Sequence, residues 1–416
     1  MTTPKSGSRE FPVRTIGDDD WTGFFEVDGH AFGGTAPDEL IEVEREIFEA
    51  GRSIGAFDGA TPVGIATAYS FDVSVPGAVL PAAGISAVGV LPTHRRRGVL
   101  RALMTHQLHD IHERGREPAA ILWASEPPIY GRFGYGLASR AYALDVLRSP
   151  NALRADVPTD PALRLRLVPA DDWKVTADVY SRVAAQRPGM LARDERWWRK
   201  AVRDLPSMRE GRSALRCVVV EDDAGVRGYA RYATKPDWAP GRPQGTVHVR
   251  EVAAVDAPAR ALLYRYLFDQ DLMAKIDVWN IATDDPLLHW LENLRSATPR
   301  WLDALYVRLV DLPAALRSRT YTAPVDVVLE VTDPICTWND GRWHLVAGSD
   351  GVSCEVTSRP ADLSMSVTEL GAIYLGGTPL AELAMAGRVT EQTPGTLAST
   401  SLAFQSSPAP WCPVVF

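Results

Sequence analysis

The sequence predicts an α/β chain, with α+β character in its last part, built from three domains at residues 1–150, 151–300 and 301–416. A chain of 416 residues exceeds the usual single domain of about 100–200 residues. A strand–turn–helix arrangement occurs once in each of the first two parts, which indicates an internal repeat. Beyond Trp301 short alternating segments follow instead, as in a half-exposed antiparallel sheet.

The first domain begins with a predicted strand at 11–16 and one or two helices within 24–50. Two further strands, 52–57 and 62–69, are separated by Asp58-Gly59, a sequence typical of hairpin turns. The apolar run 119–124 predicts a buried strand. A last strand at 141–147 is expected to close this domain.

The central motif of the first domain is residues 88–101, which read Val-Gly-Val-Leu-Pro-Thr-His-Arg-Arg-Arg-Gly-Val-Leu-Arg. A short apolar strand enters a turn, and an amphipathic helix begins after Gly98. The first turn of a helix has unpaired backbone N–H groups and attracts anions. Gly98 permits close approach of a ligand to the backbone, and the arginines add positive charge. The motif predicts an anion site, although alone it also fits a solvated basic helix start.

A second motif follows the buried strand, where residues 125–136 read Ser-Glu-Pro-Pro-Ile-Tyr-Gly-Arg-Phe-Gly-Tyr-Gly. The hydroxyl of Tyr130 in this motif is protonated at neutral pH, because an unperturbed tyrosine has a pKa of about 10, and this is the state that a proton donor requires. The alternative is that Tyr130 is a packing aromatic beside a glycine turn.

The second domain repeats the first without its charged loop. Strands at 217–220 and 226–233 flank a turn, and the strand 251–255 leads into a helix at 256–267. The arginine cluster and the glycine are missing there. We therefore expect the second copy to be structural.

The third domain is predicted to contain strands at 326–331, 341–346, 352–356 and 363–367. Helices at 368–375 and 379–386 follow, and Gly376-Gly377 is expected to end the first of them.

The net charge of −8 argues against nucleic acid as a partner and suits a cationic substrate. The acidic residues Asp18, Asp19 and Asp20, with Glu26 and Asp28, are candidates for attracting amines. A capped helix start with solvated charges explains the first three equally well.

Residues 1–8 lack the apolar region of a signal peptide, and no stretch is suited to span a membrane. The cysteines Cys217, Cys336, Cys354 and Cys412 share no metal-ligand spacing and suit a reducing compartment. We therefore expect a cytoplasmic protein with no metal site.

The two motifs resemble those of the GCN5-related N-acetyltransferases (GNAT). The loop pattern Gln/Arg-x-x-Gly-x-Gly/Ala corresponds to residues 95–100, with Leu100 in place of the usual small residue, and Tyr-x-x-x-Gly-Phe/Tyr corresponds to residues 130–135. Residues 370–377 and the order of elements around them resemble a sterol-carrier-protein-type domain. Over nearly its full length the chain resembles the enhanced intracellular survival (Eis) family, which has leucine at the position of Leu100.

The resemblance implies two tandem GNAT-like domains, the second degenerate, a sterol-carrier-like domain, and a homo-hexamer. It implies direct acetyl transfer from acetyl-CoA to amines such as aminoglycosides, at one or several positions. Acetylation of protein lysines, or a lipid-binding scaffold with an inactive acetyltransferase domain, are the alternatives. Tyr130 would be the general acid and the C-terminal carboxylate of Phe416 the general base. The residues expected to contact acetyl-CoA are Val88, Gly89, Val90, Arg96, Arg97, Gly98, Val99, Leu100, Arg101, Ser125 and Glu126.

The C-terminal segment 408–416 is unusually apolar and contains three prolines. Burying one large apolar side chain contributes roughly 1.5–3 kcal/mol, so we expect this segment to dock on the protein. A docked end places the carboxylate of Phe416 at the protein, either as the base or as part of a tail that only locks domains together.

Overall fold

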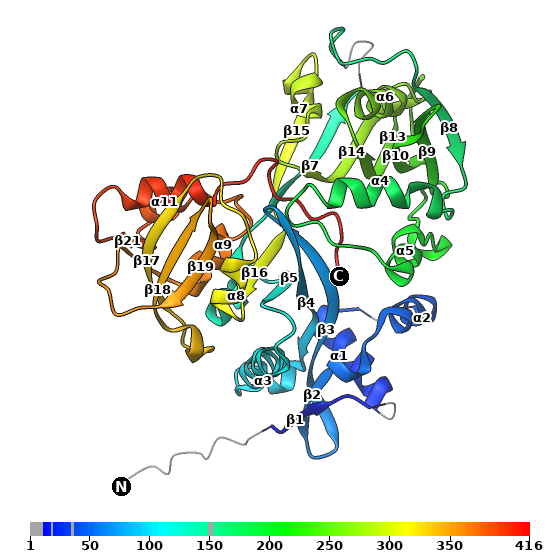
Figure 1. Ribbon diagram of the computed structural model, residues 1–416. Helices are drawn as coiled ribbons and strands as arrows, with labels where there is room; N and C mark the ends of the chain where they lie inside the picture. Colours follow the sequence, from blue (N-terminus) through cyan, green and yellow to red (C-terminus); the bar gives the residue numbers. More distant parts are fainter. Residues whose placement is uncertain (1–10, 18–19, 35–36, 149–152) are drawn as a thin grey trace.

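The computed structural model describes residues 11–17, 20–34, 37–148 and 153–416, which form three lobes around a long central β-hairpin (Figure 1). The expectations about residues 1–8, Asp18 and Asp19 lie outside the described residues.

The central hairpin consists of β3 (Thr61–Val75) and β4 (Ala78–Val90), and it forms the middle of the first sheet. The strand order of this sheet is β1-β2-β3-β4-β5-β16-β6. The remaining strands are β1 (Val13–Thr15), β2 (Ile54–Asp58), β5 (Ala119–Trp123), β6 (Gly136–Leu137) and β16 (Leu305–Leu309). The helices of this lobe are α1 (Trp21–Phe32), α2 (Asp38–Ile47) and α3 (Val99–Arg114).

The predicted strand at 141–147 does exist, but its assignment to the first domain is wrong. It is β7 (Arg140–Leu147), which lies in the second sheet between β14 (Met273–Ala282) and β15 (Ala297–Asp303). The first sheet is completed instead by β16, which pairs antiparallel with both β5 and β6. The two sheets thus exchange strands across the boundaries predicted near residues 150 and 300. An apolar strand can be buried in either sheet, so its sequence does not determine its partner.

The second sheet has the strand order β15-β7-β14-β13-β10-β9-β8. The predicted repeat is confirmed here, because a hairpin is followed by a strand that leads directly into a helix. The other elements of this lobe are β8 (Arg164–Val168), α4 (Lys174–Ala184), α5 (Glu195–Val202), β9 (Arg216–Asp222), β10 (Gly225–Lys235), β11 (Trp238–Ala239), β12 (Arg242–Pro243), β13 (Gly245–Ala254), α6 (Ala257–Phe268) and α7 (Leu287–Trp290).

The third lobe contains a five-stranded sheet in the order β19-β18-β17-β20-β21. The predicted strands and helices are present, and Gly376, with a φ of +85°, follows the end of α9. The elements are α8 (Leu312–Arg317), β17 (Val325–Thr332), β18 (Gly341–Gly348), β19 (Gly351–Val356), β20 (Leu363–Ser366), α9 (Val367–Ile373), α10 (Leu380–Met385), β21 (Val389–Glu391) and α11 (Thr396–Phe404).

The third lobe packs directly against the first. A single apolar cluster includes Tyr69 and Leu305 from the first sheet together with Leu329 and Tyr374 from the third lobe. Burial of these side chains from both lobes makes the contact a true core. Within the described ranges, no helix has the length and apolar character needed to cross a membrane.

Candidate active site

Strands β4 and β5 separate along their length and leave an opening in the first sheet. They pair in parallel only from Ala82 to Gly84 on β4, opposite Ala119–Ile121. Farther along β4, a register shift against β3 coincides with Ala87, whose φ is +48°. Such a bulge bends a strand and increases its twist. The backbone of Val88, Gly89 and Val90 is therefore not paired with β5 in the described structure.

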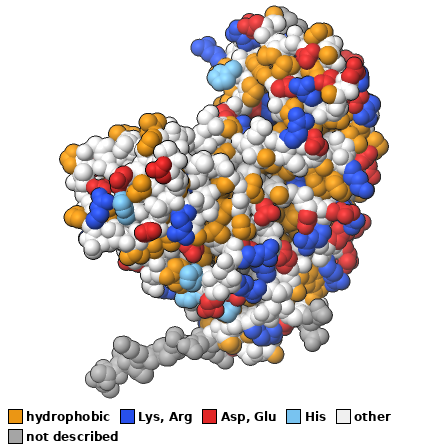
Figure 2. Space-filling view, in the orientation of Figure 1, with side chains coloured by type: hydrophobic (Ala, Val, Ile, Leu, Met, Phe, Trp, Pro, Cys, Tyr) orange, Lys and Arg blue, Asp and Glu red, His pale blue; other side chains and the backbone are white. Residues whose placement is uncertain are grey.

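The arginine loop lies between this part of β4 and the first turn of α3. Arg96 and Gly98 both have positive φ, at +61° and +91°. Among the residues that the structure describes, none caps the first turn of α3 with its side chain, so the N–H groups of this turn are open to an anion. Figure 2 shows Lys, Arg and His side chains gathered over α3, in the lower middle of the molecule.

The opening and the arginine loop share one cavity of about 840 Å³. This volume is within the range of about 300–1,000 Å³ typical of small-molecule sites. Most of the residues expected to contact acetyl-CoA line it, namely Val88, Gly89, Val90, Arg96, Gly98, Val99, Leu100, Arg101, Ser125 and Glu126.

Arg97 is not in the wall of this cavity. Its guanidinium lies over the ring of Phe11, with 4.9 Å between its Cζ and the ring centroid. Arg96 and Arg97 were both expected to contact acetyl-CoA, but in the structure only Arg96 of these two lines the cavity.

Tyr130 lines the cavity from a short segment between two 3₁₀ turns, Pro127–Ile129 and Gly131–Phe133. Its side chain is 8% exposed. Burial, and to a lesser degree the carboxylate of Glu126, raises the pKa of Tyr130 to about 12. The hydroxyl is therefore protonated throughout the neutral range.

The C-terminal tail docks, as predicted from its apolar sequence. Trp411, Cys412 and Val414 are buried. The indole N–H of Trp411 donates to Asn280 Oδ1 at 2.7 Å, and Asn280 Nδ2 donates to the carbonyl of Cys412 at 3.0 Å. Because Asn280 belongs to β14, the tail is attached to the second sheet (Figure 1).

The last residue of the tail reaches β4 at the base of the opening. The ring of Phe416 lies 4.9 Å from that of Phe71, centroid to centroid. A Cβ on Gly84 would lie 3.1 Å from Phe416 Cε2, and Gly84 is the last β4 residue paired with β5. Phe416 thus lies on the strand that forms the opening, although it is not among the residues that line the cavity.

The acidic residues near the N-terminus have different environments. Arg14 donates two hydrogen bonds to Asp20, at 2.6 and 2.9 Å, and this pairing lowers the pKa of Asp20 to about 2. Glu26 is exposed. Asp28 is partly buried, and desolvation, together with the charge of Glu44, raises its pKa to about 6. Among Asp20, Glu26 and Asp28, the members of this group that the structure describes, only Asp28 combines burial with a nearby carboxylate.

The cavity has lining residues that the sequence reasoning did not assign. Ile129, Arg132 and Phe133 belong to the Tyr130 motif, which could have indicated them. Ala31 and Phe32 at the end of α1, and Pro334 and Ile335 of the third lobe, carry no such signal. The remaining unassigned lining residues are His94 and Arg95.

Comparison with known proteins agrees with this architecture. Residues 12–138 and 189–309 each match a family model described as an acetyltransferase (GNAT) domain, and residues 312–413 match one described as a sterol carrier protein domain. The fold and the site define an N-acetyltransferase of the GCN5-related class, whose acyl donor is acetyl-CoA.

Relatives extend the match over nearly the whole chain. An uncharacterized N-acetyltransferase of Streptomyces avermitilis is 47% identical over 403 residues, covering 96% of this chain and 98% of the relative. The N-acetyltransferase Eis of Mycobacterium tuberculosis is 34% identical over 402 residues, covering 94% and 95%. The crystal structure of Eis1 from Mycobacterium abscessus superposes with a TM-score of 0.83 at 32% identity, covering 97% of this chain and 100% of that one. The chain belongs to the Eis family of N-acetyltransferases.

Proposed function

We propose that this enzyme transfers acetyl groups from acetyl-CoA directly to amino groups of cationic amines such as aminoglycosides, at one or several positions. The observation that carries the proposal is a group of aromatic rings next to Phe416 at the base of the β4–β5 opening, with carboxylates close to one of these rings, that of Tyr69. The donor site is proposed in the first domain, with Val88–Val90 beside the pantetheine arm and the arginine loop on the pyrophosphate.

A comparison of the two helix starts supports one donor site per chain. The first turn of α3 is uncapped, whereas Asp256 caps α6 by accepting the N–H of Ala259 at 2.9 Å. Asp256 also forms an ion pair with Arg227. A carboxylate thus occupies the position in the second domain that a phosphate would need.

Replacement of Arg96 by alanine is expected to weaken CoA binding by roughly 10- to 100-fold, because a hydrogen bond to a charged group contributes about 1.5–3 kcal/mol. Isothermal titration of the parent should give one site per chain. Arg97→Ala is the matched control, since its guanidinium lies over Phe11, and it should bind CoA nearly as the parent does. Two sites in the parent, or equal affinity for the parent and Arg96→Ala, would contradict this assignment.

The acceptor is proposed to bind beside Asp28 and Tyr69. Asp28 is one helical turn before Ala31, which lines the donor cavity and contacts Gly89 of β4. Tyr69 is paired in register with Gly84, the residue that touches Phe416. Asp28 therefore lies close to the place where donor and acceptor would meet.

Aromatic rings and further carboxylates complete the proposed acceptor site. The ring centroid of Trp197 lies 5.2 Å from that of Tyr69 and 4.7 Å from that of Phe71. The carboxylates of Asp28, Glu44 and Glu49 all act on Tyr69, whose pKa is raised by burial first and by these charges second. Ammonium groups bind favourably to aromatic faces and to carboxylates. Glu44 is already paired with Lys200 at 2.8 Å, and Glu49 accepts two hydrogen bonds from Ser70. The proposal therefore assigns the ammonium group to Asp28 and to the aromatic faces.

The affinity for a cationic amine is expected to depend on pH through Asp28. Asp28 is ionised above its pKa of about 6 and neutral below it, so the KM for the amine should rise as pH falls through this value. If a bound ammonium group lowers the pKa of Asp28 by about one unit, the KM for the amine should change roughly tenfold across this pH range. The measurement is KM against pH for the parent and for Asp28→Asn, which should show a high KM with little pH dependence. A parent-like profile for Asp28→Asn would remove Asp28 from the acceptor site.

In the proposed reaction, the amine nitrogen attacks the thioester carbonyl of the donor, and the C–S bond breaks. The carboxylate of Phe416 accepts the proton of the amine, directly or through a water molecule. Tyr130 donates a proton to the leaving thiolate. No cysteine takes part, and all four cysteines are buried.

A screen of amines with acetyl-CoA, read by mass spectrometry, tests the acceptor class. Aminoglycosides and polyamines should gain one or more acetyl groups. If lysine peptides were modified instead and a broad amine panel were not, the enzyme would be a protein-lysine acetyltransferase. A parent that bound CoA but acetylated neither class would favour the lipid-binding scaffold.

We also propose that the enzyme is a cytoplasmic homo-hexamer, in keeping with the closed symmetry common among soluble homo-oligomers. Light scattering across a range of protein concentrations should give six times the chain mass. A monomer mass at every concentration would contradict a hexamer.

A further inference from the structure

The donor cavity has a wall that comes from the sterol-carrier-like domain. Pro334 and Ile335 line the cavity from the connection between β17 and β18. Ile335 also packs against the apolar cluster that includes Tyr130 and Phe133. Residues of the third domain therefore face the same space as the two acetyltransferase motifs.

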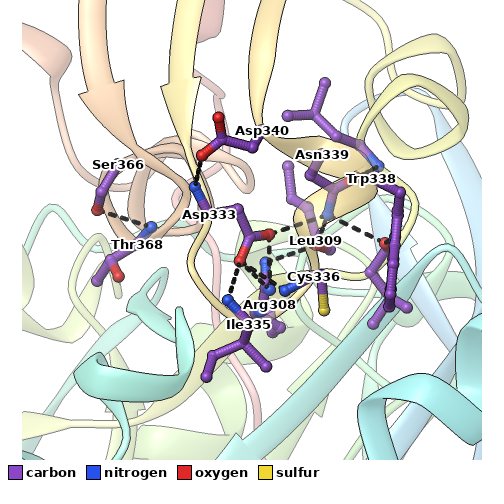
Figure 3. A network of polar contacts seen from close by, with 12 residues as sticks. Arg308, Leu309, Asp333, Ile335, Cys336, Trp338, Asn339, Asp340, Ser366 and Thr368 are labelled. Carbon is purple, nitrogen blue, oxygen red and sulfur yellow. Dashed lines mark hydrogen bonds and ion pairs between the residues drawn. The ribbon is translucent and has the colours of Figure 1, made fainter. Parts of the chain in front are cut away.

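A buried ion pair holds this connection in place (Figure 3). Arg308 Nη2 lies 2.8 and 2.7 Å from the two carboxylate oxygens of Asp333, and the two side chains are 0% and 1% exposed. Oδ1 of Asp333 also accepts the backbone N–H groups of Ile335 and Cys336, at 3.2 and 3.0 Å. The carboxylate thus binds the backbone of Ile335 while it is paired with a strand of the first sheet.

Asn339 extends the same network to the backbone of the first sheet. Its Nδ2 donates to Asp333 Oδ2 and to the carbonyl of Leu309, both at 3.1 Å. Its Oδ1 accepts the N–H of Leu312 at 3.0 Å. The side-chain polar atoms of Asp333 and Asn339 are all paired, whereas Arg308 Nε has no hydrogen-bond partner among the described residues. The pairing of Asp333 and Asn339 favours one arrangement of the connection.

Trp338 connects the same segment to α3. Its indole N–H donates to the carbonyl of Val310 at 2.7 Å. Its ring stacks on His112, with 3.9 Å between centroids and an interplanar angle of 14°. Since α3 begins at the arginine loop, residues 333–339 are attached both to the sheet and to the helix that form the donor site.

We propose that residues 333–339 are a donor-binding segment, in which Pro334 and Ile335 contact acetyl-CoA and help to set its affinity. Asp333 is a positioning residue that fixes Ile335 through its backbone. This inference rests on the proposed donor site in the first domain. The third domain is then part of the acetyl-CoA site as well as a packing partner.

The test is CoA titration and steady-state kinetics with Ile335→Ala in the full chain. Loss of apolar contact with a ligand should weaken CoA binding by roughly tenfold and raise the acetyl-CoA KM similarly. The acceptor KM should stay at the parent value. The change in the acetyl-CoA KM should exceed any change in kcat at saturating acetyl-CoA, because Ile335 also packs against the cluster that includes Tyr130. Ile335→Val should recover most of the affinity because it keeps the branched carbon.

Leu383→Ala is the matched control, since Leu383 is a partly buried side chain of the same domain that packs on its core and not on the donor cavity. It should lower Tm without changing CoA affinity. Asp333→Asn should raise the acetyl-CoA KM even at temperatures well below its Tm, where the variant is folded. If Asp333→Asn does not fold, Ile335→Ala alone tests the proposal.

An Ile335→Ala protein that binds CoA as tightly as the parent would overturn the inference, whatever its Tm. A parent that failed to bind CoA at all would instead overturn the proposed donor site.

Discussion

Replacement of Tyr130 by phenylalanine should lower kcat by roughly 100- to 10,000-fold, the usual contribution of a positioned general acid or base. The hydroxyl is the only group removed, and the ring that packs in the apolar cluster remains. CoA affinity should therefore change little. The measurement is kcat with saturating donor and amine, together with CoA titration of the same variant.

Tyr135→Phe is the matched control for this variant. Tyr135 lies in the same motif, its ring centroid is 6.0 Å from that of Tyr130, and it is 1% exposed. Its hydroxyl has no hydrogen-bond partner among the described residues, so its removal costs no hydrogen bond. Parent-like kcat in Tyr135→Phe and loss in Tyr130→Phe would assign the proton transfer to Tyr130. Equal and small effects in both would show that Tyr130 is a packing aromatic.

The raised pKa of Tyr130 also predicts the pH profile of the reaction. A tyrosine with a pKa of about 12 keeps its proton well above neutrality. Ionisation of Tyr130 should therefore not lower the rate between about pH 7 and pH 10. A tyrosine with the ordinary pKa of about 10 would be about half ionised at the upper end of this range. Glu126 contributes to the raised pKa, so the charge in this wall helps to keep the acid protonated.

The parts of the site that were predictable are those encoded in short segments. Residues 88–101 specify a strand, a turn and a helix with an uncapped first turn, and they do so without reference to the rest of the chain. The features responsible are the order of these residues, the glycine and the arginines. The motif around Tyr130 is equally local, and the structure brings both to one cavity. The conformation and charge of each motif depend mainly on residues that are adjacent in the sequence.

The parts that were not predictable depend on distant partners. The exchange of β7 and β16 between sheets is a choice of pairing partner, which an apolar strand does not record in its own sequence. Asp20 and Asp28 have the same side chain in one short segment. Only the fold pairs the first with Arg14 and partly buries the second beside Glu44. Ile335 is held at the cavity by the buried ion pair of Arg308 and Asp333, whose two members lie in different domains.

Addition of one glycine after Phe416 should lower kcat by roughly 100- to 10,000-fold, or about 3–5 kcal/mol of transition-state stabilisation. The extension keeps the phenyl ring but moves the carboxylate along the chain by about 3.8 Å, the distance between successive Cα atoms. Because the ring packs on Phe71 and the tail is attached through Trp411 and Asn280, the extended protein should remain folded with a similar Tm.

The control is Val415→Ala, which changes a neighbouring side chain that is 45% exposed and leaves the carboxylate in place. Its kcat should equal that of the parent. Loss of activity in the extended protein should be greatest at low pH, where the amine is mostly protonated and depends most on a base. If the extended protein is folded and turns over at the parent rate, the terminal carboxylate is not the base. The buried residues Trp411, Cys412 and Val414 would then mark a tail that only holds the second domain against the first.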